Sequence, residues 1–232
     1  MTIEGRALGR LQHDPIAVAS VPQHYAAVMP KPALDRSHIP FTPGLYDNDW
    51  APNCTAVALA NAARGASWSA AGCDLVVDPA KPLAFYAECV NVPDEKPAIL
   101  ATDGAVGLAV LGQADRLGFD IGPQSLVPAW RRCRVGDRFA MADAIDSQAL
   151  YLGVGLALAD QAYTTWDTAT PGDQTCGSWG GHMVFGWDYT GLGDTDIVRI
   201  GTWGGWQKVT WRWVDARARE IYAITFRQIG AA

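Results

Sequence analysis

The sequence lacks any uninterrupted apolar run long enough to span a bilayer. Its first ten residues, MTIEGRALGR, also lack the apolar middle region of a signal peptide. We therefore expect no membrane contact and, unless a leader was removed earlier, a cytoplasmic chain. Charge is scarce as well: charged residues make up 18% of the chain, and the net charge is −6. This mildly acidic balance argues against a nucleic-acid partner.

Histidine and cysteine are few, and their spacing excludes two kinds of site. Five cysteines at irregular intervals do not make a disulfide framework. Cys133 and Cys176 could pair in oxidising surroundings, which the sequence leaves open. Neither residue type has metal-ligand spacing, so we expect no metal and no other cofactor. The cysteines are Cys54, Cys73, Cys89, Cys133 and Cys176, and the histidines are His13, His24, His38 and His182.

Apolar residues, in contrast, make up 49% of the 232 residues, and ten residues are tryptophans. That composition predicts a globular chain with a sizeable core. The first 45 residues are rich in proline, which favours extended structure and predicts an arm over residues 1–45 that lies on the surface. We expect a helical lobe over 46–138 and a β lobe over 139–232 to follow, within one domain overall.

Hydrophobic periodicity predicts helices first and strands second. Helices are expected over the alanine-rich run that follows Cys54 and over 81–91, 104–117 and 139–149. Alternation predicts strands over 150–158, 182–189, 197–203, 208–214 and 220–227, with Trp211 and Trp213 on one strand face. Short turns favour antiparallel pairing of the later strands. The predicted fold class is α+β, with a long loop over 163–181 beside the candidate site.

Cys54 stands where the polar turn YDNDWAPN gives way to the expected helix. A helix N-terminus and a nearby imidazolium both lower the pKa of a thiol and activate it as a nucleophile. His182 is the histidine outside the proline-rich arm, and it opens a predicted strand in GGHMVFGWDYTG. The alternative for each residue alone is structural, because free cysteines are commonly buried and strand histidines are commonly just hydrogen-bonded.

These motifs resemble the papain-like (C1) cysteine peptidases, in particular their bacterial branch. The turn and helix in GLYDNDWAPNCTAVALANAA are similar to the family's segment around its nucleophile. GGHMVFGWDYTG is similar to the family's GGHAVLLVGYD, and IVRIGTWGGW is similar to its FIVRNSWG. The order of elements agrees from about residue 8 to the end. The resemblance implies a papain-like two-lobe fold, with a helical lobe, an antiparallel β lobe and a cleft between them.

The resemblance also implies roles for individual residues. Cys54 would be the nucleophile and His182 its general base. Asn48 stands where the family has the glutamine that binds the oxyanion, and its side chain is one methylene shorter. Trp203 keeps the family's SWG tryptophan and would form a wall of the cleft.

One family residue is missing. Gly201 stands where the family has the asparagine that orients the histidine, so the third triad position is lost. Without an orienting group, such a triad loses several powers of ten in rate. Asp188 and Thr202 are nearby replacements, although Thr202 should point to the opposite face of its strand from Gly201.

Two hypotheses for the function follow. The first is a papain-like cysteine peptidase or a related thiol acyl-transfer hydrolase that works through Cys54 and His182. The second is a catalytically impaired papain-fold protein that binds a peptide or serves as a structural or assembly component, for example in a phage particle. The partner is a peptide or protein in both cases. Retention of Cys54 and His182 favours the first hypothesis, and Gly201 favours the second.

Overall fold

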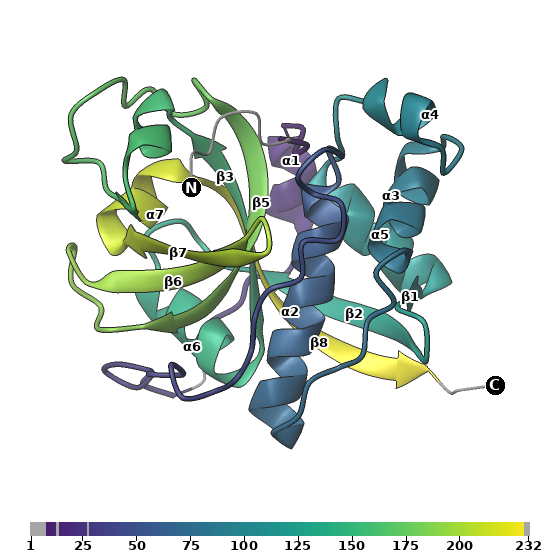
Figure 1. Ribbon diagram of the computed structural model, residues 1–232. Coiled ribbons are helices and arrows are strands. Elements are labelled where there is room, and N and C mark those ends of the chain that lie inside the picture. The colour runs from purple at the N-terminus through teal and green to yellow at the C-terminus, as the bar shows by residue number, and fades with distance from the viewer. Residues whose placement is uncertain (1–7, 13, 27, 230–232) are drawn as a thin grey trace.

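A long alanine-rich helix, α2 (Cys54–Ala71), lies between a group of helices and a large sheet (Figure 1). The computed structural model describes residues 8–12, 14–26 and 28–229. Small side chains allow close packing on most sides of α2, and every residue from 54 to 63 is buried. The helix ends at Gly72, whose φ of 67° gives the left-handed conformation common after a helix C-terminus. The alanine-rich run therefore holds the first turn of α2 deep inside the molecule.

The helices beside α2 follow the predicted periodicity. Helix α3 (Lys81–Val90) has Pro82 in its first turn, and α5 (Gly107–Leu117) buries Val110, Leu111 and Ala114. The short helix α4 (Lys96–Leu100) was not predicted. Helix α6 (Arg138–Ser147) begins after Asp137, whose side chain accepts a hydrogen bond from the Ala140 amide.

An eight-stranded sheet forms the other side, in the order β1-β2-β8-β3-β5-β6-β7-β4. Neighbouring strands are antiparallel except for β4 and β7, which are parallel. Strand β3 is buried along its whole length, since helices cover both faces of the sheet there. The strands are β1 (Phe119–Asp120), β2 (Ser125–Arg132), β3 (Ala149–Leu156), β4 (Thr165–Trp166), β5 (Gly180–Tyr189), β6 (Ile197–Thr202), β7 (Gly205–Thr210) and β8 (Ala218–Ile229).

The strand predicted over 208–214 is wrong in its second half. Strand β7 ends at Thr210, whose hydroxyl accepts a hydrogen bond from the Trp213 amide at 3.3 Å and caps helix α7 (Trp211–Arg217). Trp211 and Trp213 are buried from this helix and do not line a strand. The following strand, β8, pairs with β2 and β3 rather than with β7. β2 itself was not predicted.

The arm is held against the body by backbone hydrogen bonds at several points. Helix α1 (Pro15–Ser20) interrupts the extended course of the arm. Outside the arm, a 3-10 helix, η1 (Leu158–Ala162), follows strand β3. The His24 amide donates to the Arg132 carbonyl at 2.7 Å, and the Leu34 amide donates to the Tyr189 carbonyl at 2.8 Å. Residues 1–7, His13 and Ala27 of the predicted arm, and residues 230–232, lie outside the described residues.

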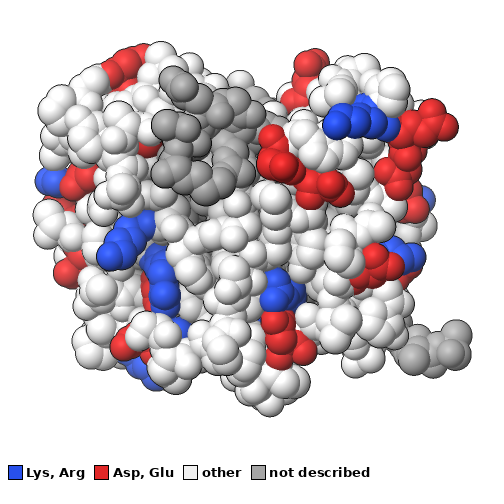
Figure 2. All heavy atoms as spheres, in the orientation of Figure 1, with Lys and Arg blue, Asp and Glu red and all other residues white. Residues whose placement is uncertain are grey.

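The surface has mixed charge on the face in view. Acidic and basic side chains lie apart from one another or in small groups of opposite sign. Residues without a charged side chain, drawn white, cover most of this face (Figure 2). Within the described part of the chain, no helix is long and apolar enough to cross a membrane.

Candidate active site

Cys54 is the first residue of α2, at the end of the helix that faces the arm. The residue before it, Asn53, does not cap the helix with its side chain; its amide Nδ2 donates to the Tyr46 carbonyl at 2.9 Å. The first-turn N–H groups therefore have no side-chain cap from Asn53. Such open N–H groups, together with the helix dipole, favour negative charge at this position.

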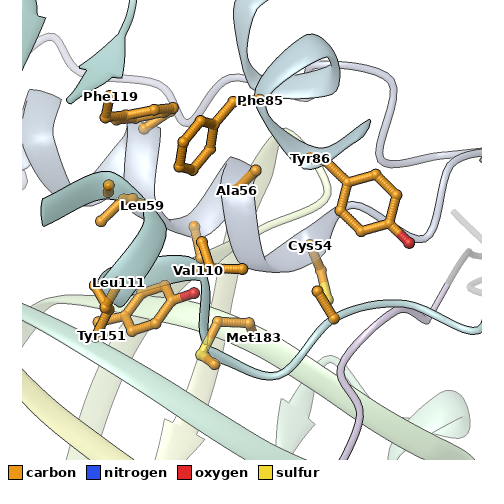
Figure 3. Packing of buried hydrophobic residues seen from close by; sticks show 14 of the residues in the cluster. Cys54, Ala56, Leu59, Phe85, Tyr86, Val110, Leu111, Phe119, Tyr151 and Met183 are labelled. Atoms are coloured by element: carbon orange, nitrogen blue, oxygen red, sulfur yellow. The ribbon is translucent and has the colours of Figure 1, made fainter. Parts of the chain in front are cut away.

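The thiol of Cys54 is enclosed where the helices meet the sheet. Figure 3 shows it beside Tyr86 of α3 and Met183 of β5, and the residue is 1% exposed. Burial raises the pKa of the thiol to about 11. The backbone amides of Met183 and Gly9 and the charge of Arg10 act in the opposite direction and lower the pKa, but burial dominates. Cys54 is therefore a neutral thiol in this arrangement.

His182 lies near the start of β5, directly before Met183. Its ring stacks on Trp203, with a centroid distance of 4.2 Å and an interplanar angle of 18°. Its Nε2 atom is hydrogen-bonded to Thr202 Oγ1 at 2.6 Å, whereas Nδ1 has no hydrogen-bond partner among the described residues. Full burial lowers the pKa of His182 to about 3, so the imidazole is also neutral. Trp203 and Thr202 hold the ring, and Nδ1 remains open.

The position of the missing asparagine is filled by an aromatic ring. A Cβ atom at Gly201 would lie 1.9 Å from Cε1 of Phe185, which pairs with Gly201 across the sheet. No side chain fits at Gly201 unless Phe185 moves. Thr202, on the opposite face of the strand, takes the place next to His182.

Asp188, the other candidate replacement, is engaged elsewhere. Its carboxylate is paired with Arg199 and accepts a hydrogen bond from the Arg36 amide at 3.2 Å. The guanidinium of Arg36 in turn donates to the Trp187 carbonyl at 2.9 Å. This cluster ties the arm to β5 and β6, and Asp188 does not reach His182.

Asn48 lies in the turn before α2 but is directed into its own loop. The residue is 1% exposed, and its Nδ2 atom donates to the Ala51 carbonyl at 3.2 Å. Tyr46 and Asp47 before it adopt positive φ angles of 45° and 65°, so the turn is tight. In this conformation one Asn48 N–H is committed within the turn, and the Cys54 amide is the other donor expected near an oxyanion.

A segment of the arm passes directly over this site, which the sequence interpretation missed. Backbone hydrogen bonds hold the segment on both sides: the Ala105 amide donates to Gly9 (2.7 Å), the Leu11 amide to Ala105 (2.9 Å) and the Arg10 amide to Gly181 (3.3 Å). Arg10 pairs with Ala105 as a parallel β-bridge. Residues 8–11, here called the cleft segment, thus lie between α5 and β5 as an added strand would.

Glycines make room for the cleft segment. A Cβ atom at Gly9 would lie 1.7 Å from the Pro52 carbonyl oxygen, immediately before the Cys54 helix. A Cβ at Gly104 would lie 2.0 Å from the Gly9 oxygen, and one at Gly181 would lie 2.2 Å from the Arg10 oxygen. Glycine is the residue that permits such close backbone approach. These glycines were visible in the sequence, but their partners were not.

The cysteines of the described part of the chain are not paired with one another. Cys54, Cys73, Cys89, Cys133 and Cys176 are all free, so the possible Cys133–Cys176 pair is not formed. Burial raises the pKa of Cys89 and of Cys133 to about 12. Across the residues that the structure describes, no group of three or more histidine, cysteine or acidic side chains could hold a metal ion.

Comparisons with known proteins point to one fold. Neither a family model nor a curated protein matches the sequence. Solved structures match over nearly the full chain. Xylellain, a cysteine protease from Xylella fastidiosa, is 15% identical with a TM-score of 0.68, and the match covers 95% of this chain and 96% of that chain.

Two other structures agree. Procathepsin B S9 from Trypanosoma congolense is 11% identical with a TM-score of 0.66, covering 96% of this chain and 87% of that one. The Carica candamarcensis cysteine protease CMS1MS2, solved in complex with E-64, is 14% identical with a TM-score of 0.57, covering 84% and 98%. The chain therefore has the α+β fold of the papain-like cysteine proteases, with N-terminal helices and a C-terminal antiparallel sheet. The predicted fold is confirmed.

Proposed function

We propose that the protein is a papain-like cysteine peptidase or a related thiol hydrolase, held in a latent state by its own arm. The observation that carries the proposal is the hydrogen bond between His182 Nε2 and Thr202 Oγ1. It supplies an orienting contact for the histidine where Gly201 cannot. Because Nε2 is engaged, Nδ1 is the ring nitrogen left to accept a proton.

The chemistry runs through Cys54. The thiol proton passes to Nδ1 of His182, and the sulfur attacks the carbonyl carbon of a bound peptide or other acyl substrate. The first-turn amide of Cys54 stabilises the oxyanion, and Asn48 joins it if its amide turns away from the Ala51 carbonyl. The C–N bond then breaks, and the leaving amine takes the proton from His182. Water hydrolyses the thioester, with His182 again acting as the base.

The latent state follows from the cleft segment. Its backbone occupies the space between Ala105 and Gly181, where an extended peptide would pair. Gly9 of the segment also lies against the buried thiol of Cys54, and burial favours the neutral forms of both Cys54 and His182. Displacement of the segment would rehydrate the pair and allow proton transfer.

The second candidate is a papain-fold protein that binds peptides without cleaving them, as a structural or assembly component. Two observations favour it: Cys54 and His182 are both held neutral, and Asn48 bonds within its own turn. The two candidates differ in one outcome. A peptidase forms a covalent acyl intermediate on Cys54, and a binding protein does not.

Intact-mass spectrometry on the full chain tests the proposal. The Arg10→Ala variant, which loosens the cleft segment, is incubated with p-nitrophenyl acetate and quenched in acid. We expect a gain of one acetyl group, mapped to Cys54, that is lost in Arg10→Ala/His182→Ala. Acetylation that is absent, or that does not depend on His182, would reject the peptidase and leave the binding protein.

A further inference from the structure

Glu220 is an acidic side chain buried beneath the cleft segment. It lies near the start of β8, and its side chain is 0% exposed. Both carboxylate oxygens are paired: Oε1 accepts from Arg10 Nε at 2.9 Å, and Oε2 accepts from the Tyr222 hydroxyl at 3.0 Å. The Arg10 side chain is 4% exposed. A buried carboxylate of this kind requires a cationic partner, since an unpaired buried charge is strongly destabilising.

The space around this ion pair is shaped by glycines. A Cβ atom at Gly153 of β3 would lie 2.4 Å from Arg10 Nε and 2.6 Å from Glu220 Cγ. A Cβ at Gly107 of α5 would lie 3.0 Å from Glu220 Oε1. Any larger residue at Gly153 would therefore fill the place of the guanidinium. Residues of α5, β3 and β8 thus surround the space that the Arg10 side chain fills beside Glu220, here called the Glu220 pocket.

Arg10 enters this pocket from a segment that is also held by backbone hydrogen bonds and by the packing of Leu8. Hydrogen bonds from Ala105 and to Gly181 recognise the main chain and do not depend on the side chain at position 10. Of the neighbouring residues, Gly9 has no side chain, Leu11 is 39% exposed, and Leu8 packs as an apolar side chain near Gly180. Arg10 therefore supplies the buried charged contact of the cleft segment. Beside it, an open cavity of about 530 Å³, lined in part by Gln12, Cys176 and Arg219, leaves room for further peptide residues.

We propose that the Glu220 pocket is a guanidinium site, and that the peptides or proteins taken by this cleft place an arginine side chain in it. Arg10 is the intramolecular occupant that such a peptide displaces. The proposal rests on the proposed function only in requiring that the cleft accept a peptide from outside. It does not require that Cys54 react. Arginine suits the pocket better than lysine because the donor to Glu220 is Nε, and lysine has a methylene group at that place in its side chain.

Peptide binding to the full chain tests this. The probe is a fluorescein-labelled peptide of residues 8–12, LGRLQ, and the readout is fluorescence anisotropy. Its matched control carries citrulline, which has nearly the same shape as arginine but no charge. We expect the arginine peptide to bind the Arg10→Ala protein about tenfold or more tightly than the citrulline peptide. The unmodified protein should bind it more weakly than Arg10→Ala does, because Arg10 fills its pocket.

Further variants assign the preference to the pocket. Arg10→Ala/Glu220→Gln keeps a group that accepts a hydrogen bond from Tyr222 but lacks the charge. The arginine and citrulline peptides should therefore bind this variant about equally. Arg10→Ala/Gly153→Ala should lose binding of the arginine peptide by steric filling. Arg10→Ala/Gly112→Ala is the matched glycine control, because a Cβ at Gly112 meets nothing within 4 Å. Circular dichroism checks that each variant is folded, and Arg10→Gln replaces Arg10→Ala if the latter does not fold.

Equal affinity for the arginine and citrulline peptides, or no binding of either to folded protein, would overturn the proposal. The outcome is independent of catalysis, since anisotropy does not involve the thiol. If Cys54 is not acylated but the arginine peptide binds selectively, the peptidase fails and the pocket stands. If Cys54 is acylated and no preference for arginine is found, the pocket fails and the peptidase stands.

Discussion

His182 Nε2 lies 2.6 Å from Thr202 Oγ1, on the neighbouring strand, while the face behind Gly201 is closed by the ring of Phe185. His182 therefore contacts Thr202, which is one residue along β6 from Gly201 and on the other face of the strand. Trp203, whose φ of 45° is rare for a non-glycine residue, turns its ring onto His182 directly after this threonine.

The first prediction concerns this contact. Thr202→Val keeps the shape of the side chain but removes the hydroxyl, so the ring of His182 loses its hydrogen bond. In the Arg10→Ala background, we expect acetylation of Cys54 by p-nitrophenyl acetate to slow about tenfold or more. Thr202→Ser is the matched control and should retain most of the rate. A Thr202→Val protein as fast as its parent would show that the hydroxyl does not position the ring.

Placing the family's asparagine at position 201 should destabilise the protein. Gly201→Asn forces a side chain into the ring of Phe185, where a Cβ would lie 1.9 Å away. We expect a loss of about 1–3 kcal/mol in the free energy of unfolding, measured by urea denaturation. Gly201→Asn/Phe185→Leu, which removes the obstructing ring, should recover part of the loss. A Gly201→Asn protein as stable as the parent would contradict the packing described here.

Loosening the cleft segment should expose the thiol. Gly9→Ala places a Cβ 1.7 Å from the Pro52 oxygen and so displaces the segment without touching Glu220. We expect iodoacetamide to modify Cys54 at least about tenfold faster in Gly9→Ala than in the unmodified protein, because the thiol gains water and its pKa falls. Peptide mapping separates Cys54 from the exposed Cys73, which serves as the internal control. Unchanged rates at Cys54 would show that the segment does not shield it.

Stability should depend on pH through His182. Its pKa in the folded protein is lowered to about 3 from an ordinary value of 6.5, so the unfolded chain binds the proton first as the pH falls. The free energy of unfolding therefore decreases between about pH 6.5 and pH 3, with a slope from this group approaching about 1.4 kcal/mol per pH unit. Urea titrations of the parent and of His182→Gln at several pH values isolate the contribution of His182 to this slope. Parallel pH profiles for the two proteins would contradict a buried neutral histidine.

At alkaline pH, Cys54 should make the free energy of unfolding fall as the pH rises. Burial raises the pKa of Cys54 to about 11 from 9.0, so above about pH 9 the unfolded chain loses its proton first. Stability should fall between about pH 9 and pH 11, and Cys54→Ala should reduce the slope relative to the parent. A slope that Cys54→Ala leaves unchanged would argue against a fully buried thiol in the resting protein.

Features set by local sequence were predictable. The alanine-rich run predicts α2, with Cys54 at its first turn, because small residues favour a helix that packs on most sides. The strand that begins near His182 follows from its apolar run. The helix at Trp211–Arg217 was mistaken for a strand, because Trp211 and Trp213 alternate with polar residues while the Thr210 cap decides the outcome.

Features set by distant pairing were not predictable. The Arg10–Glu220 ion pair joins residues 210 positions apart, and neither residue carries a local pattern that names the other. The role of Thr202 depends on the register of β5 against β6, in which Phe185 faces Gly201 and closes one side. Gly9 and Gly153 mark close approaches, but a sequence does not show what approaches them.

The rate of Cys54 alkylation against pH shows whether Cys54 and His182 form an activated pair once the cleft segment is displaced. It is measured by intact mass and peptide mapping in Arg10→Ala and in Arg10→Ala/His182→Ala. We expect selective modification of Cys54 near pH 6 in the first variant and its loss in the second, because a thiolate–imidazolium pair forms once the cleft segment is displaced. Modification only above about pH 8, as for an ordinary free thiol, or none at all, would contradict it.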